Sequence, residues 1–288
     1  MAYILLTLSV LLSTARNLLS KNLSGIHFGS KAFFLCQSIL FSFGTIAVII
    51  FSGFSITVIS YITLSLALVY GLLLILAQWF YTASLAKGNT ALCSTVYSLG
   101  FILPTLSGAI FWSESFSLLD LLGVLCAVTA VCISGLKSKA KGETKNIYYF
   151  IPLLIAMLAS GGLGIIQKLQ QSSSFAEQKS IFLFVAFSLA ALISFIFSFF
   201  AKKEDYTNFR FSKLTVASCV GLFFGCCNFL NTSIAGMLES SIFFPTLNIG
   251  VILLSMISGR IFFKEKIKTK EIYVLLLGGA SILLLNFG

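Results

Sequence analysis

Charged side chains are scarce in this chain, and their scarcity excludes a water-soluble globule. Only 10% of the 288 residues are charged, whereas 58% are hydrophobic and the mean hydropathy is +1.03. A soluble protein of this size carries roughly 25% charged residues. The chain has too little polar surface to cover a water-facing globule, so the lipid bilayer must surround most of it.

Several chemistries lack the residues that they need. The only histidine is His27, and the seven cysteines form no C-x-x-C pair, so no zinc or other metal site is expected. The sequence contains no phosphate-binding glycine loop, no nucleophile–base pair and no cofactor motif. We therefore expect neither an enzyme nor an ATP-driven pump, and no cofactor.

The formal net charge of +10 could indicate a nucleic-acid partner. However, the nineteen Lys and Arg lie mostly between apolar runs, and they build no basic helix or aromatic–basic platform. We interpret these charges as setting the orientation of the chain in a membrane, and we expect no nucleic-acid partner.

Ten apolar runs are long enough to cross the membrane as helices, for which roughly 20 residues are needed. They lie near 2–20, 32–51, 62–83, 91–112, 118–136, 147–167, 181–200, 214–235, 241–263 and 271–287. A Lys-rich linker over 138–146 separates a first five-span unit, 1–137, from a second, 147–288. The expected fold class is an all-α integral membrane protein with ten transmembrane helices.

No Asp or Glu lies in the middle of any of these runs. Proton-coupled export of lipophilic cations generally uses a carboxylate buried in the membrane. The sequence therefore disfavours antiport of cationic drugs.

The second unit repeats part of the first. An offset of 151 residues matches the signature G-x-I-F-x-x-E, which spans 108–114 in the first unit and 259–265 in the second. An offset of 150 places Gln78 on Asn228. Because each unit has an odd number of spans, the second copy must enter the membrane from the opposite side, which predicts two inverted repeats.

The placement of charge agrees with inversion. Most Lys and Arg fall on odd-numbered connections between spans: Lys21, Lys31, Lys87, Lys137, Lys139, Lys141, Lys145, Lys202, Lys203, Arg210, Lys213, Lys264, Lys266, Lys268 and Lys270. The even-numbered connections carry essentially Lys168 and Lys179. By the positive-inside rule, the odd connections are cytoplasmic and both termini lie outside.

The stretch YTASLAKGNTALCSTVYSLGFILPTLSGAIFWSESFSLLDLLGVL at 81–125 resembles the signature of the EamA family in the drug/metabolite transporter (DMT) superfamily. Its elements are a third span rich in small residues, a fourth span with a central Pro104, and an apolar run that ends at Glu114. The second unit repeats the pattern over 231–271 and ends it at Glu265. The resemblance covers essentially the whole chain and implies a multi-pass transporter of a small molecule in the bacterial cytoplasmic membrane.

Two departures from the family pattern stand out. Ser255 occupies the position that corresponds to Pro104, and the usual aromatic residue near the start of the first span is missing. The resemblance also implies cytoplasmic termini, which conflicts with the charge count. The sequence thus leaves the sidedness of the termini open.

Arg16 is the first candidate for binding substrate, because it lies about 14 residues into the first span, where a charge is costly. Two interpretations are open. Its side chain could snorkel to the nearby headgroups, or it could anchor a carboxylate or phosphate, with Asn17 beside it.

The remaining candidates are uncharged polar side chains inside spans: Gln37, Gln78, Tyr81, Tyr97, Asn228, Asn231 and Asn248. The repeat pairs Gln78 with Asn228, Tyr81 with Asn231 and Tyr97 with Asn248. On inverted helices, such matched groups can converge on a substrate site near the midplane. The alternative is hydrogen bonding between helices that only holds the bundle together.

Three further features have structural interpretations. Pro104 with Gly100 predicts a static kink, and Gly221 with Gly225 predicts a close helix contact. Glu114, like Glu265, is interpreted as capping a turn or a helix end.

The sequence thus predicts a secondary transporter that moves a small anionic or zwitterionic metabolite, such as an amino acid, by alternating access. The last span of each unit would support the bundle or form contacts in a homodimer. Two alternatives remain: a flippase for a lipid-linked substrate, and a membrane sensor or scaffold that transports nothing.

Overall fold

The computed structural model describes residues 1–20, 23, 26, 28–53, 58–87, 93, 96–135, 150–201, 211–263 and 269–287. The helices are α1 (Ala2–Ser20), α2 (Lys31–Ser52), α3 (Tyr61–Lys87), η2 (Leu99–Phe101), α5 (Ile102–Phe111), α6 (Leu118–Gly135), α7 (Phe150–Ser172), η4 (Ala176–Gln178), α8 (Lys179–Phe200), α9 (Phe211–Ala235), α10 (Ser240–Phe263) and α11 (Thr269–Phe287). The 138–146 linker and Glu265 lie outside the described residues.

Seven of the described helices are long and apolar enough to cross a membrane, and three shorter apolar helices span Val96–Phe111, Leu118–Ile133 and Ile272–Phe287. Helices suit lipid because every backbone hydrogen bond is made inside the segment. Large apolar side chains face outward, as Phe200 does at 84% exposure and Ile110 at 71%. The chain is therefore a membrane-embedded helical protein.

The helix bounds follow the predicted spans closely, with two informative differences. The fourth span, predicted over 91–112, contains the 3₁₀ turn η2 directly before α5. Pro104 thereby becomes the third residue of α5, where its missing N–H interrupts no bond of that helix. The predicted kink thus coincides with a change of helix type.

The sixth span, predicted over 147–167, is the second difference. Helix α7 continues to Ser172 and so includes Lys168. The added turn is polar, but its side-chain donors find partners. Gln170 Nε2 donates to the carbonyl of Phe175, and Lys168 pairs with Glu114.

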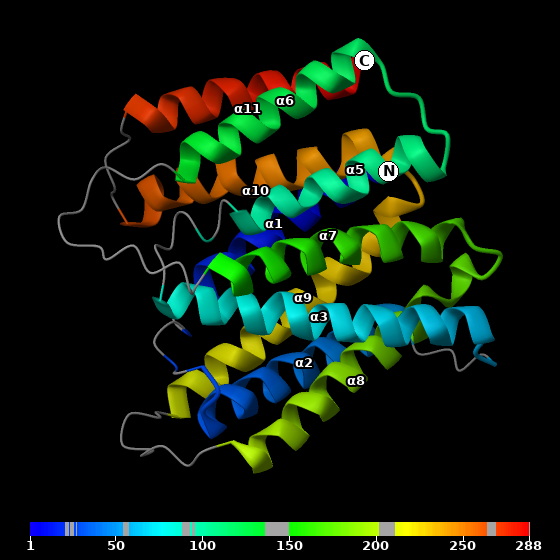
Figure 1. Ribbon diagram of the computed structural model, residues 1–288, viewed down its shortest axis with the longest axis vertical. Coiled ribbons are helices and arrows are strands. Elements are labelled where there is room, and N and C mark those ends of the chain that lie inside the picture. The colour runs from blue at the N-terminus through cyan, green and yellow to red at the C-terminus, as the bar shows by residue number, and fades with distance from the viewer. Residues whose placement is uncertain are drawn as a thin grey trace.

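The two units interleave rather than standing apart (Figure 1). Helices α6 and α11 lie together at one end of the long axis, and α2 and α8 lie at the other. Between them, α3 packs against α7 and α8, while α9 packs against α1 and α2. Helix α10 contacts both α1 and α5. Both termini lie on the same side of the molecule (Figure 1).

Glycines bring α9 and α2 into close contact. A Cβ on Gly221 would overlap the carbonyl oxygen of Leu40, and a Cβ on Gly225 would overlap that of Gly44. The close helix contact predicted from the G-x-x-x-G pair is therefore confirmed. Around it, buried apolar side chains of α2, α3, α8 and α9 form one core, and those of α1, α6, α9, α10 and α11 contribute to a second.

Candidate functional site

Arg16 turns toward two neighbouring helices. Its Nη2 donates to Gln78 Oε1 on α3 at 3.3 Å, and its Cζ lies 3.9 Å from the centroid of the Phe224 ring on α9. Its Nε is buried and has no hydrogen-bond partner. The guanidinium group is thus positioned by two side chains, and its buried Nε–H is left to bind another acceptor.

A buried hydrogen-bond network lies beside Arg16. The hydroxyl of Tyr70 on α3 donates to Asn228 Oδ1 on α9, and Gln167 Nε2 on α7 donates to the Tyr70 hydroxyl at 2.8 Å. Asn228 Nδ2 donates to the carbonyl of Phe224 at 2.8 Å, which links this network to the ring beneath Arg16.

We call Arg16, Tyr70, Gln78, Gln167, Phe224 and Asn228 the central polar cluster. The end of α9 at Ala235 and the start of α3 at Tyr61 lie on the same side of the bundle (Figure 1). Measured along the helix from that side, Asn228 lies about 10 Å into α9 and Gln78 about 25 Å into α3. The central polar cluster therefore extends across the middle of the bundle, and it draws on α1, α3, α7 and α9.

Two predicted tyrosines lie next to one another. The rings of Tyr81 on α3 and Tyr97 are 4.4 Å apart between centroids and inclined at 37°. Tyr81 lies three residues after Gln78, about one turn along the same helix. The tyrosine pair thus borders the central polar cluster and adds an aromatic surface to it.

The other predicted residues have separate surroundings. Asn231 accepts a hydrogen bond from Ser9 on α1, and Asn248 donates to the carbonyl of Phe244 on its own helix. Gln37 is buried with its Oε1 unpartnered, whereas Asn17 is exposed. Of the three pairs matched by the repeat, Gln78 and Asn228 are the one whose members both belong to the central polar cluster.

Sequence reasoning missed Tyr70 and Gln167. Tyr70 is a lone aromatic residue in a continuous apolar run, and Gln167 falls on the last residue of its predicted span. Only the second offered a signal, because it opens the polar stretch Gln-Lys-Leu-Gln-Gln that α7 keeps helical.

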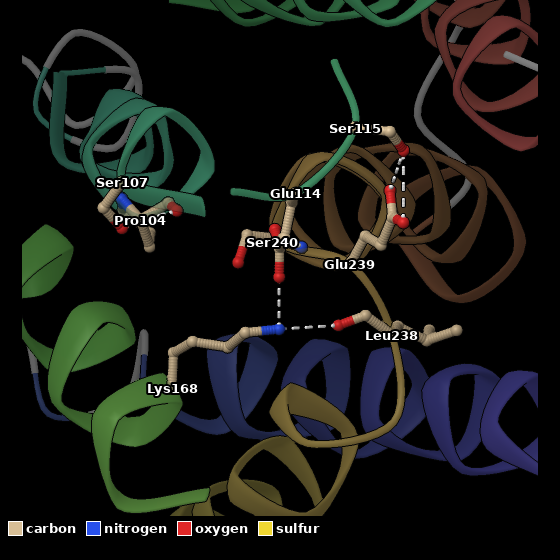
Figure 2. A network of polar contacts seen from close by, with 8 residues as sticks. All are labelled: Pro104, Ser107, Glu114, Ser115, Lys168, Leu238, Glu239 and Ser240. Carbon is tan, nitrogen blue, oxygen red and sulfur yellow. Dashed lines mark hydrogen bonds and ion pairs between the residues drawn. The ribbon is translucent and has the colours of Figure 1, made fainter. Parts of the chain in front are cut away.

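A second polar group joins α7, the α5–α6 connection and the segment between α9 and α10 (Figure 2). Glu114 accepts from the N–H of Ser240 at the start of α10, so its interpretation as a helix cap is confirmed. The cap joins the two units of the chain. Lys168 Nζ forms an ion pair with the same carboxylate. Lys168 was assigned to a connection from the sequence and not considered for function.

The described part of the chain holds no group of three or more His, Cys, Asp or Glu that could bind a metal ion. The polar side chains of the central polar cluster are instead an arginine, amides and a phenol. Such groups recognise carboxylates, phosphates, ammonium groups and hydroxyls by hydrogen bonding and charge.

Comparison with known proteins reveals the fold but no family. No known family profile matches the chain. An uncharacterized protein of Haemophilus influenzae is 29% identical over 178 residues, which are 59% of this chain and 57% of that protein. The match thus spans less than two thirds of the length of either protein. One solved crystal structure aligns with 98% of this chain and 95% of its own at a TM-score of 0.76 and 14% identity. At that identity, the likeness shows that the two chains share a fold.

Proposed function

We propose that the chain is a secondary transporter of the EamA-like drug/metabolite type. It moves a small anionic or zwitterionic metabolite, such as an amino acid, across the bacterial cytoplasmic membrane. Its two five-helix units, 1–137 and 147–288, are inverted repeats that rock about a site near the midplane. The observation that carries the proposal is Arg16, which is held across the two units with its buried Nε–H left to bind another acceptor.

The pattern of helix contacts supports inverted repeats. Matching the units in chain order pairs α1 with α7, α2 with α8, α3 with α9, α5 with α10 and α6 with α11. Most contacts across the units then have a counterpart. The α1–α9 contact matches α7–α3, α2–α9 matches α8–α3, and α1–α10 matches α7–α5. The pairs α2–α8, α5–α10 and α6–α11 match themselves, as an axis of two-fold pseudosymmetry requires.

Close glycine contacts repeat in the same way. A Cβ added at Gly71 on α3 would press against the carbonyl oxygen of Ala186 on α8, and one added at Gly221 on α9 would overlap that of Leu40 on α2. The two glycines are 150 residues apart, the same offset that places Gln78 on Asn228. Sequence and packing thus support the same duplication.

The central polar cluster supports an anionic or zwitterionic substrate. Arg16 binds a carboxylate or phosphate through Nε, with a charge-assisted hydrogen bond stronger than a neutral one. The amide oxygens of the cluster can accept hydrogen bonds from an ammonium group of the same substrate. Because buried polar atoms without partners are costly, the unpartnered Nε of Arg16 favours a substrate that completes its bonds.

The test is flux into liposomes that contain the purified protein. A pooled set of carboxylated, phosphorylated, zwitterionic and cationic metabolites is supplied outside, and mass spectrometry identifies those that enter. Substitution Arg16→Gln should weaken substrate affinity about 10- to 100-fold, the value of a hydrogen bond to a charged group. Lys213→Gln, which removes a positive charge at the start of α9, serves as the control.

Two results would contradict the proposal. One is flux of cationic metabolites alone by the wild-type protein. The other is flux of anions that Arg16→Gln leaves unchanged in a correctly inserted protein.

A further inference from the structure

We propose that the ion pair between Lys168 and Glu114 is a latch that closes one end of the helix bundle and opens when the two units move apart. Lys168 lies four residues before the end of α7, and Glu114 lies in the connection between α5 and α6. Each side chain is only 11% exposed. Connections 112–117 and 236–239 lie together on one side of the bundle, where α5 and α9 end (Figure 1). We call this side the latch end.

Each of the two charged groups has two polar partners (Figure 2). One oxygen of Glu114 pairs with Lys168 Nζ, and the other accepts the N–H of Ser240 at 2.7 Å. Lys168 Nζ also donates to the carbonyl of Leu238 at 3.1 Å. The ion pair thereby ties α7 and the α5–α6 connection to the segment where α9 ends and α10 begins.

A second contact joins the same two connections. The Ser115 hydroxyl lies 3.2 and 3.3 Å from the two carboxylate oxygens of Glu239 and donates to them. Ser115 belongs to the first unit and Glu239 to the second, as do Glu114 and Lys168 respectively. Every one of these side-chain contacts, except that of Lys168 with Leu238, crosses between the units that must separate during alternating access.

Burial makes the ion pair an all-or-none contact. If the two charges separated slightly, each would stay buried without its partner, which is strongly unfavourable. If they separated fully, each would be hydrated, and a buried pair is worth little more than two hydrated charges. The contact therefore has two favourable arrangements of similar free energy, closed and open, as a bistable gate requires.

Helix α7 connects the latch to the central polar cluster. Gln167, the neighbour of Lys168, donates to Tyr70 inside the cluster. One turn earlier, a Cβ on Gly164 would lie 2.8 Å from Pro104 on α5, so the two helices pack closely. A shift of α7 consequently moves the cluster contact and the latch contact together. The coupling of the latch to substrate rests on the proposed transport function, but the closure itself does not.

Two substitutions test the latch, with one control. Lys168→Met removes the charge and keeps the length of the side chain. Glu114→Gln removes the opposite charge and keeps an oxygen that accepts the Ser240 N–H, so α10 stays capped. Lys179→Gln is the matched control, because Lys179 lies on the same side of the bundle but bonds Ser233 within the second unit.

The measurement is the labelling rate of Cys227 by a membrane-impermeant thiol reagent, with the other six cysteines replaced. Cys227 is 2% exposed and lies about 12 Å along α9 from Ala235. It accepts a hydrogen bond from Ser13 and so reports from the middle of the bundle. In a cysteine-free protein, Met237→Cys, at a position 50% exposed in the α9–α10 connection, identifies the latch side of the vesicle.

We expect both variants to label Cys227 about tenfold faster from the latch side, which corresponds to a shift of about 1.4 kcal/mol in the closed–open equilibrium. Lys179→Gln should label at the wild-type rate. Wild-type rates in both latch variants, measured on protein that elutes as a single peak, would overturn the latch.

Flux measured on the same vesicles separates the two proposals. Faster labelling in a protein that transports none of the pooled metabolites supports the latch and contradicts the transporter. Anion flux with unchanged labelling supports the transporter and contradicts the latch.

Discussion

The guanidinium carbon of Arg16 lies 3.9 Å from the centroid of the Phe224 ring, across the boundary between the first and second units. A cation over the face of an aromatic ring is attracted by the ring's quadrupole, and the attraction is stronger where water is excluded. Because Phe224 also packs against Phe41 and Phe187, its ring has little freedom to turn. The aromatic packing therefore fixes the position of a charge inside the membrane.

Phe224→Leu should loosen Arg16 without removing it. The cation–π attraction is worth about 0.5–2 kcal/mol, so we expect substrate affinity to fall about 2- to 30-fold in the liposome flux assay. Phe195→Leu, on the exposed face of α8, is the control and should leave affinity unchanged. Equal affinities for Phe224→Leu and the wild type would mean that the ring does not help to orient Arg16.

Tyr70→Phe should destabilise the bundle, because it leaves Asn228 Oδ1 without its buried phenol donor and removes the nearer of the two acceptors of Gln167 Nε2. Hydrogen bonds between membrane helices are worth about 0.6–2 kcal/mol. We expect a lower melting temperature by size-exclusion thermostability, while Tyr273→Phe, at a position 57% exposed on α11, should melt with the wild type. Identical melting of Tyr70→Phe and the wild type would indicate that the network contributes nothing measurable.

The helices were predictable from the sequence, whereas most of the contacts between them were not. Apolar run length alone predicted α1 over 2–20, the residues that α1 occupies. The network of Tyr70 with Gln167 depends on which faces of α3 and α7 meet. Hydropathy carries no such information, because in lipid the outward and inward faces of a helix are both apolar.

The sequence repeat predicted some of the contacts between helices that hydropathy does not reveal. Pairing Gln78 with Asn228 selected two residues that the fold brings into one cluster, in line with the proposed duplication, in which matched helices occupy related positions. It failed for Asn248, whose amide donates to its own helix backbone. It could not select Tyr70, whose counterpart at the offset of 150 is Val220. A polar residue that lies in only one unit leaves no trace in such a comparison.

Gly225→Ala should weaken the contact between α9 and α2, because the added Cβ would overlap the carbonyl oxygen of Gly44. Close approach of backbones through small residues is a main source of helix association in lipid. We expect a melting temperature lower by several degrees, since overpacking costs about 1–3 kcal/mol. Gly279→Ala is matched to it, because a Cβ at Gly279 meets no atom within 4 Å. If both variants melted alike, the close contact would not be a determinant of stability.

Glu114→Ala should destabilise the protein more than Glu114→Gln. The alanine variant loses both the ion pair with Lys168 and the bond to the Ser240 N–H, whereas glutamine retains an acceptor for that N–H. Loss of a helix cap costs about 0.5–2 kcal/mol. The expected order of melting temperatures is wild type, then glutamine, then alanine. Equal melting of the two variants would show that Glu114 does not stabilise the start of α10.

Both termini should lie outside the cytoplasm. The structure places them on the same side of the bundle as connections 112–117 and 236–239, which are the connections poor in Lys and Arg (Figure 1). Basic residues are retained on the cytoplasmic side during insertion, so the opposite side, which carries the termini, should face outward. Alkaline phosphatase fused to Phe287 should then be active and a fluorescent protein at the same position dark. The resemblance to the EamA family implies the reverse result, so this pair of fusions decides between the charge count and the family pattern. It also determines the face of the membrane on which the Lys168–Glu114 latch closes.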